Sequence, residues 1–454
     1  MDANPARESP RVSADVIVIG AGFAGLSAAV ELTRQGARVL VLEARPGLGG
    51  RATAFVDPDT GEKVDNGQHV LIGCYDETFR FLRTIGSESL VSLDERLNVE
   101  FIDPNGTRTR LRSVSLPAPW HLAVGLATWG ALTWRDRLAA LRLGAVLTKL
   151  DPHAAHGLPD ETIDEWLVRH GQTARLRQML WEPLALAALN QAPSVASAAP
   201  FLTVLAKMFG GSRRNAAIGL PRVPLDALYA IPAANWIGTR GGMVRTGTPA
   251  QIVCDGDRVS HVTVRGERFP ATAIISTVPW YALDHTIPQV PPTLQETMRN
   301  AALMMSSPIV TVNVWFDRPV TPVPFVGLPG RTLQWVFDKR QAFGETASHL
   351  SLVSSGADSI VAEPNRALID RAVAEVRGAL HEAAHATVLR ATVVRERRAT
   401  FSLAPGQPPR PSTRTAIQGL FLAGDWIDTG LPGTIESAVV SGHRAAQMVL
   451  DAEP

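Results

Sequence analysis

Three glycines early in the chain have the spacing that lets a backbone bind phosphate groups. They follow an apolar segment at residues 15–19 and precede a helical pattern that runs to about residue 35. In this arrangement the first glycine permits a tight turn, the second lets the backbone approach a pyrophosphate, and the third lets the helix pack against the strand. The positive end of the helix then faces the phosphates. The predicted contacts with a dinucleotide are Gly20, Gly22, Phe23, Ala24 and Gly25.

An acidic residue and a second glycine-rich loop follow this turn. Glu43 stands 23 residues after Gly20, at the end of a predicted strand, where a carboxylate can accept hydrogen bonds from ribose hydroxyls. The loop after it ends in arginine and could wrap backbone and positive charge around a bound pyrophosphate. A nicotinamide-binding domain does not need such a loop, so the pattern favours FAD. The predicted contacts here are Glu43, Arg45, Gly49, Gly50 and Arg51.

A third candidate cofactor element lies near the end of the chain. An apolar strand leads to Gly424 and Asp425, and Gly433 precedes the final predicted helix. We expect the Asp425 carboxylate to bind the ribityl hydroxyls of a flavin. Free N–H groups of Thr434 and Ile435, at the helix N-terminus, would face the flavin pyrimidine oxygen, where negative charge builds on reduction.

Length, charge and cysteine content exclude several other classes of protein. The 454 residues predict two to three domains, and a net charge of +1 gives no global field that would attract nucleic acid. Two cysteines cannot make a disulfide framework, and His153 and His156 lack other ligands nearby, so no metal site is predicted. The polar N-terminus lacks a signal-peptide core, and no uncharged stretch is long and unbroken enough to span a bilayer. These features predict a cytoplasmic protein.

The elements that must position these residues read as an α/β fold. Short strands are predicted within residues 243–278, with a hairpin turn at Asp255 and Gly256, and a capping box starts a helix at Thr162. An amphipathic helix carries an apolar stripe of Ile369, Val373, Val376 and Leu380, and a last helix covers residues 435–450. We predict a discontinuous Rossmann-type FAD-binding domain, a helical region and an α+β substrate region. Their predicted bounds are 14–112, 225–290 and 412–454 for the FAD-binding domain, 113–224 for the helical region, and 291–411 for the substrate region.

The three cofactor elements together resemble the superfamily of FAD-dependent amine oxidases and carotenoid or squalene desaturases, over nearly the whole chain. Residues 65–75, 333–339 and 424–432 are similar to the hydroxysqualene dehydroxylase family of bacterial hopanoid pathways. The resemblance implies a GR2-like flavoprotein fold and noncovalent FAD. It also implies a reaction in which hydroxysqualene loses its hydroxyl as water and takes hydride from reduced flavin to give squalene.

The resemblance also implies further site residues. Gly67, Gln68 and His69 would lie near the cofactor, and Ala250 would lie beside the adenine, where relatives usually carry valine. His69 is the leading candidate for a catalytic residue, while Asp65, Tyr75 and Asp338 are weaker ones. The predicted substrate pocket includes Trp335 and Phe337.

A tryptophan-rich stretch between residues 120 and 134 suggests that the protein binds a membrane surface. It is apolar, too short to span a bilayer and flanked by arginines, which is typical of a helical insertion that lies in a membrane interface. Helices packed in an ordinary core remain the alternative. The predicted partners are an apolar C30 isoprenoid, the inner face of the cytoplasmic membrane, an unidentified electron donor and the upstream squalene-pathway synthases.

Three rival functions differ in what they require of the sequence. The amine oxidase branch resembles a pattern with a lysine on a substrate-domain strand, yet the matching segment 308–316 has none, and no tyrosine lies in the C-terminal flavin segment. A carotenoid or phytoene desaturase, running the flavin oxidatively, remains an alternative because sequence does not fix the direction of electron transfer. A flavoprotein scaffold without catalysis, bound to the membrane, is the third.

Overall fold

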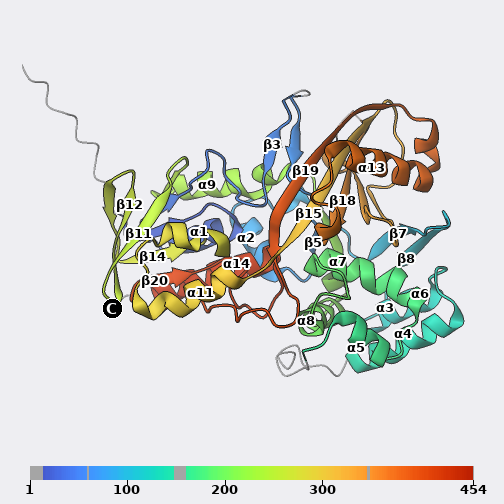
Figure 1. Cartoon of the computed structure of the whole chain (residues 1–454), viewed down its shortest axis with the longest axis horizontal. Coiled ribbons are helices and arrows are strands. Elements are labelled where there is room, and N and C mark those ends of the chain that lie inside the picture. Colours follow the sequence, from blue (N-terminus) through green and yellow to red (C-terminus); the bar gives the residue numbers. More distant parts are fainter. Residues whose placement is uncertain (1–13, 59–60, 148–159, 345–347, 453–454) are drawn as a thin grey trace, which may run out of the picture.

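The computed structural model describes residues 14–58, 61–147, 160–344 and 348–452 (Figure 1). A five-stranded parallel sheet forms the centre of the half of the molecule that carries the predicted cofactor segments. Apart from the edge strand at residues 243–245, its strands are short, apolar and almost completely buried, as expected for a sheet covered on both faces. They come from widely separated parts of the chain. In spatial order they are β10 (Met243–Arg245), β2 (Val39–Leu42), β1 (Val16–Ile19), β14 (Ala273–Ser276) and β20 (Leu420–Leu422).

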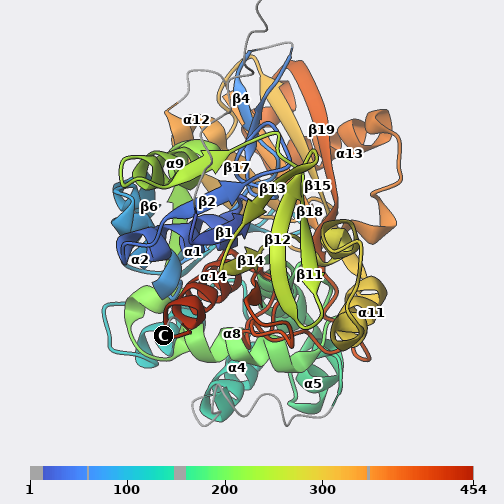
Figure 2. The same ribbon diagram turned by 90° about the vertical axis from the view of Figure 1, so that its left-hand side faces the viewer.

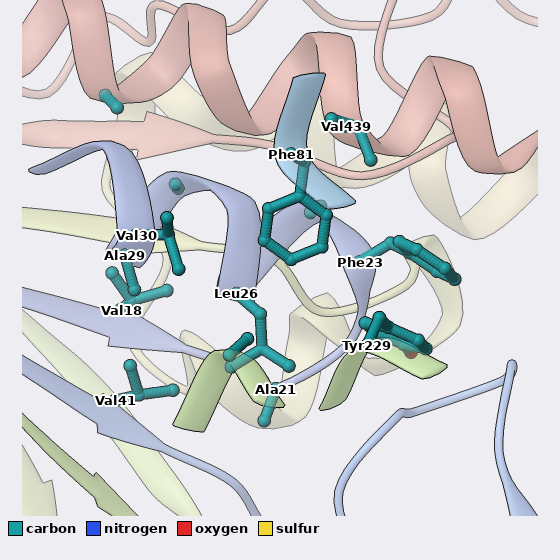
Figure 3. Close-up of a cluster of buried hydrophobic side chains, with 14 of the residues drawn as sticks. Val18, Ala21, Phe23, Leu26, Ala29, Val30, Val41, Phe81, Tyr229 and Val439 are labelled. Atoms are coloured by element: carbon teal, nitrogen blue, oxygen red, sulfur yellow. The ribbon is translucent and has the colours of Figure 1, made fainter. Parts of the chain in front are cut away.

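Helices cover one face of this sheet, and a small antiparallel sheet covers the other (Figure 2). On the helical face, Phe23 stacks on Tyr229 with ring centroids 3.5 Å apart, and Figure 3 shows this pair beside Phe81 and Leu26. The helices are α1 (Phe23–Arg34), α2 (Asp76–Thr84), α9 (Ile231–Gly238) and α14 (Ile435–Leu450). The small sheet consists of β11 (Ala250–Asp255), β12 (Arg258–Val264) and β13 (Glu267–Pro270).

A seven-stranded mixed sheet forms the second half of the molecule. One face packs on α13 (Asn365–Ala379) through valines and leucines, and the other face is turned inward. In spatial order the strands are β19 (Val388–Phe401), β15 (Ser306–Phe316), β18 (Ser348–Ser355), β17 (Trp335–Asp338), β16 (Phe325–Gly327), β7 (Asn98–Ile102) and β8 (Arg108–Arg112). Strands β7 and β8 therefore join this sheet, although we assigned residues 98–112 to the FAD-binding domain.

A group of helices packs at one end of the seven-stranded sheet, at the lower right of Figure 1. They are α3 (Trp120–Thr128), α4 (Trp134–Leu147), α5 (Ile163–Arg169), α6 (Ala174–Leu176), α7 (Glu182–Leu189) and α8 (Ala198–Phe209). The remaining α-helices and strands of the described chain are β3 (Ala54–Val56), β4 (Lys63–Asp65), β5 (Leu71–Ile72), β6 (Val91–Leu93), β9 (Ile218–Pro221), α10 (Leu283–Thr286), α11 (Gln295–Leu303) and α12 (Lys339–Phe343), and short 3-10 and π-helical segments lie between them.

Local sequence signals predicted several of these elements well. Thr162 and Glu165 form the reciprocal hydrogen bonds of a capping box at α5, and Asp255 and Gly256 connect β11 to β12. The predicted stripe of α13 is displaced, because Leu368, Ala372 and Val376 form its buried face while Ile369 and Val373 lie at the edge. The position of the sheet decides which face of this helix is buried.

Candidate functional site

A single large cavity, of about 970 Å³, joins the two halves of the described structure. It begins at the C-terminal ends of the parallel strands, where α/β sheets bind their ligands. It continues along the inner face of the seven-stranded sheet. The first end is lined by glycines and polar groups, and the second by apolar side chains, so the cavity can hold a polar cofactor and an apolar molecule together.

The glycine turn after β1 has the close contacts that its sequence predicts. A Cβ on Gly25 would lie 1.9 Å from the carbonyl oxygen of Gly20, so only glycine lets the helix approach the strand here. Gly20 has φ +108°, a conformation that favours glycine. Gly22 is the N-cap of α1 and supplies no side-chain acceptor, so the first N–H groups of the helix remain available for an anion. Gly20, Gly22, Phe23 and Ala24 line the cavity, whereas Gly25 lies behind it.

The Glu43 carboxylate lies at this turn and is already hydrogen bonded. It accepts from the Ala21 N–H at 2.8 Å and from the Arg45 N–H at 2.9 Å. Both Glu43 and Arg45 line the cavity, and the Arg45 guanidinium donates to the carbonyl of Gly50 at 3.3 Å. Glu43 therefore holds the glycine turn, and ribose binding by its remaining lone pairs stays a prediction.

Arg51 and Asp425, which are 374 positions apart, form an ion pair inside the cavity. Arg51 also donates to the carbonyl of Ala399 at 3.0 Å. We expected these two side chains to serve different parts of a cofactor, the arginine at a pyrophosphate and the carboxylate at ribityl hydroxyls. In the structure they neutralise each other, and the two cofactor contacts remain predictions.

Tyr229 supports the second glycine loop and was missed by the sequence analysis. The single hydrogen of its hydroxyl is shared between the carbonyls of Gly49 at 2.7 Å and Ala52 at 3.1 Å, and its ring lies on Phe23. Gly49 and Gly50 line the cavity, and a Cβ on Gly50 would lie 3.4 Å from the Cα of Gly22. The two glycine segments thus form one narrow cradle.

The N-terminus of α14 differs from the prediction in one respect. The Thr434 N–H is not free, because it donates to the carbonyl of Pro432 at 2.8 Å. The Thr434 hydroxyl accepts from the Ser437 N–H and caps the helix. Gly433, Thr434 and Ile435 all line the cavity, so Ile435 offers the backbone donor at this point. No residue pattern in the sequence predicts this hydrogen bond from Thr434 back to Pro432.

The segment after β4 brings His69 into the cavity and places Asp65 outside its lining. Gly67, Gln68 and His69 line the cavity. Burial lowers the pKa of His69 from 6.5 to about 4, with the nearby charge of Lys339 acting in the same direction and the Asp65 carboxylate opposing both. The imidazole is therefore neutral at pH 7.

Asp65 itself is held in a buried ion pair. Its carboxylate accepts from the Lys339 ammonium at 2.8 Å and from the Leu225 N–H at 3.0 Å. Asp338 is also absent from the lining, because it caps α12 and pairs with Arg340. Tyr75, in contrast, lines the cavity. The structure thus gives the two aspartates supporting roles.

The apolar end of the cavity has a wall of aromatic and aliphatic side chains. Trp335 and Phe337, the predicted pocket residues, alternate along β17 and both line it. Cross-strand register places Phe325 opposite Phe337 on the same face. Lining residues that the sequence analysis did not identify are Val99, Phe101, Leu122, Leu126, Leu184 and Phe209. At the opposite end, Ala250 lines the cavity beside Thr248 and Arg265.

The tryptophan-rich stretch divides between the core and the surface. Trp129 is only 1% exposed and belongs to the core, so the expectation that the stretch lies as a unit at an interface was wrong for this residue. Trp120 and Trp134, in contrast, are 64% and 68% exposed. Across the described ranges, no helix is both long and apolar enough to cross a membrane.

The described residues contain no cluster of three or more histidine, cysteine, aspartate or glutamate side chains that could hold a metal ion. His153 and His156 lie outside the described residues.

Comparison with known proteins gives these features a family context. The sequence profile of the flavin-containing amine oxidoreductases matches residues 23–450. Hydroxysqualene dehydroxylase of Rhodopseudomonas palustris is 33% identical over 97% of this chain and 99% of its own length. The chloroplastic or chromoplastic zeta-carotene desaturase of Capsicum annuum is 25% identical over 96% of this chain and 81% of its own.

A solved structure shares the fold at lower identity. Putrescine oxidase bound to putrescine superposes with a TM-score of 0.71 at 17% identity, covering 97% of this chain and 100% of that one. This likeness supports the two-part architecture. Evidence about the substrate comes from the cavity lining and from the relatives of higher sequence identity.

Proposed function

Because the chain belongs to the flavin-containing amine oxidoreductases, and within them to the hydroxysqualene dehydroxylases, we propose that it reduces hydroxysqualene to squalene. Its cofactor is FAD, which in its reduced form supplies hydride. The observation that carries the proposal is the cavity, whose glycine-lined end continues into an end made of aromatic and aliphatic side chains.

The described residues fit the cofactor at several points. The uncapped first turn of α1 and the paired glycine segments would hold the pyrophosphate, and Glu43 and Ala250 would lie toward the adenosine part. Asp425 and Ile435 would contact the flavin part. No attachment motif is evident, so we propose that the FAD is bound noncovalently.

The apolar end suits a substrate that loses a hydroxyl group. When an allylic C–O bond breaks, the carbon becomes positive and must be captured by hydride rather than by water. A cavity lined by Trp335, Phe337 and Phe101 excludes water from that carbon. His69, as a neutral imidazole, can orient the hydroxyl by a hydrogen bond, but its low pKa leaves it without an extra proton to give at pH 7.

The direction of electron transfer tests this proposal. Anaerobic protein with photoreduced FAD should be reoxidised when hydroxysqualene is added, and squalene should appear in matching amount. If phytoene or squalene instead reduced the oxidised flavin, and hydroxysqualene had no effect, the chain would be a desaturase like its carotenoid relatives. If no isoprenoid changed the flavin in either direction, a non-catalytic scaffold would be favoured.

We further propose that α4 docks the protein on an anionic phospholipid surface, at the inner face of the cytoplasmic membrane. Trp134, Leu138 and Leu141 recur at spacings of four and three residues and are all exposed, so they form one outward stripe. Arg135 and Arg142 flank the stripe and are exposed as well. Apolar side chains with adjacent arginines suit the headgroup region of such a membrane.

The neighbouring helix α3 connects this surface with the cavity. Trp120 is exposed, while Leu122 and Leu126 of the same helix line the cavity. A C30 hydrocarbon dissolved in the bilayer would therefore have a short route to the site. The electron donor and the upstream synthases that we predict as partners would meet the protein at the same membrane.

Vesicle sedimentation tests the docking surface. Wild type should sediment with phosphatidylglycerol-rich vesicles more than with phosphatidylcholine vesicles, and a Trp134→Ser, Leu138→Ser, Leu141→Ser variant should remain in the supernatant. Val168→Ser on α5 is the matched control, because Val168 is 55% exposed and lies on another helix. Equal sedimentation of the triple variant and wild type would refute the proposal.

A further inference from the structure

Glu396 lies on the inner side of β19, where the two ends of the cavity meet. Cross-strand register pairs it with Ile309 of β15, and both residues line the cavity. Ile309 packs with the apolar cluster around Phe337 and Val353. Farther along β19, Thr400 lines the cofactor end, and its Cβ lies 3.4 Å from where a Cβ on Gly433 would be.

Among the cavity carboxylates of the described structure, Glu396 is the one without a hydrogen bond or ion pair. The other two are engaged, since Glu43 accepts from two backbone N–H groups and Asp425 pairs with Arg51. Since no protein group occupies the Glu396 oxygens, they are available to a polar group of a molecule that fills the cavity.

We propose that Glu396 is the catalytic acid that protonates the departing hydroxyl group, an inference that rests on the proposed function. The carboxyl proton passes to the hydroxyl oxygen, and the allylic C–O bond breaks with both electrons going to that oxygen, which leaves as water. The carbon becomes positive beside the new Glu396 carboxylate and takes the hydride that reduced FAD supplies. Glu396 then regains a proton from solvent before the next turnover.

The Glu396 carboxylate interacts electrostatically with the Arg51 guanidinium, which also pairs with Asp425. The other titratable groups that line the cavity are Glu43, Arg45, His69, Tyr75, Arg265, Tyr281 and His285.

The test compares Glu396→Gln and Glu396→Asp with wild type as FAD-loaded proteins. Stopped-flow reoxidation of the reduced flavin by hydroxysqualene should slow at least about 100-fold in E396Q and less in E396D, because general acids contribute about 10²–10⁴-fold. Hydroxysqualene affinity should stay within about twofold. Arg397→Gln, one residue along the strand and exposed, is the matched control and should react like wild type.

A second readout needs no turnover. In substrate-free protein, Glu396→Gln should raise the midpoint potential of the bound flavin, because a nearby anion disfavours electron uptake. If E396Q kept both the wild-type rate and the wild-type potential, the inference would be overturned while the proposed function stood. If wild-type protein itself were not reoxidised by hydroxysqualene, the proposed function would fail and the acid role with it.

Discussion

The buried ion pair of Lys339 and Asp65 shows how single residues support the site without touching a ligand. Both side chains are almost fully buried, at 1% and 3% exposure, and neither lines the cavity. Removing one partner leaves an uncompensated buried charge, which costs about 3–5 kcal/mol. We therefore expect Lys339→Met to lower the free energy of unfolding by this amount in urea titrations. The double variant with Asp65→Leu should recover part of the loss, and a double variant no more stable than the single one would contradict this account.

At the same scale, His69 should make stability depend on pH. Its folded-state pKa of about 4 lies below its unfolded value of 6.5, so the unfolded chain binds the proton more readily. The contribution of the neutral His69 to the free energy of unfolding is fully present above pH 6.5. As the pH falls toward 4, up to about 3 kcal/mol of this free energy is lost. Urea titrations between pH 7.5 and 4.5 should show this slope in wild type and a shallower one in His69→Gln. An unchanged slope in the variant would show that other groups cause the acid sensitivity.

At the scale of elements, the close packing of α1 and α14 depends on one glycine. A Cβ on Gly442 would lie 2.3 Å from the carbonyl oxygen of Ala24 and 2.4 Å from the hydroxyl of Ser27. Gly442→Ala should therefore push the helices apart, destabilise the protein by about 1–3 kcal/mol and weaken FAD retention, because Ala24 lines the cavity. Gly144→Ala in α4, which meets no atom within 4 Å, is the control and should stabilise by about 0.5–1 kcal/mol. Both effects are measured by urea titration and by flavin absorbance after gel filtration.

At the scale of the whole molecule, the cavity links segments that are far apart in the chain, including Gly20, Arg51, Ala250 and Asp425. A ligand that binds them only in the folded state must stabilise the entire structure. Free FAD at about 100 times its dissociation constant should add about 2.7 kcal/mol to the stability of the apoprotein. The measurement is the urea midpoint of apoprotein with increasing FAD, with NAD at equal concentration as the control. Equal shifts with both nucleotides would argue against a flavin-specific site.

The sequence by itself determined the parts of this protein that depend on local physics. The glycine turn at Gly20 follows from backbone sterics, and the capping box at Thr162 follows from hydrogen bonds within one turn. The matching family motifs added FAD and a squalene-type substrate. These signals lie within a few neighbouring residues, so no knowledge of distant segments is needed to interpret them.

Only the tertiary structure decided which distant residues meet. It paired Arg51 with Asp425 and Asp65 with Lys339, and it buried Trp129 while exposing Trp134. It also placed Glu396 in the cavity, where one side of an edge strand faces the site. The physical reason is that strand register and sheet packing, which bring together residues hundreds of positions apart, set these contacts. The spacing of neighbouring residues in the sequence does not predict these contacts.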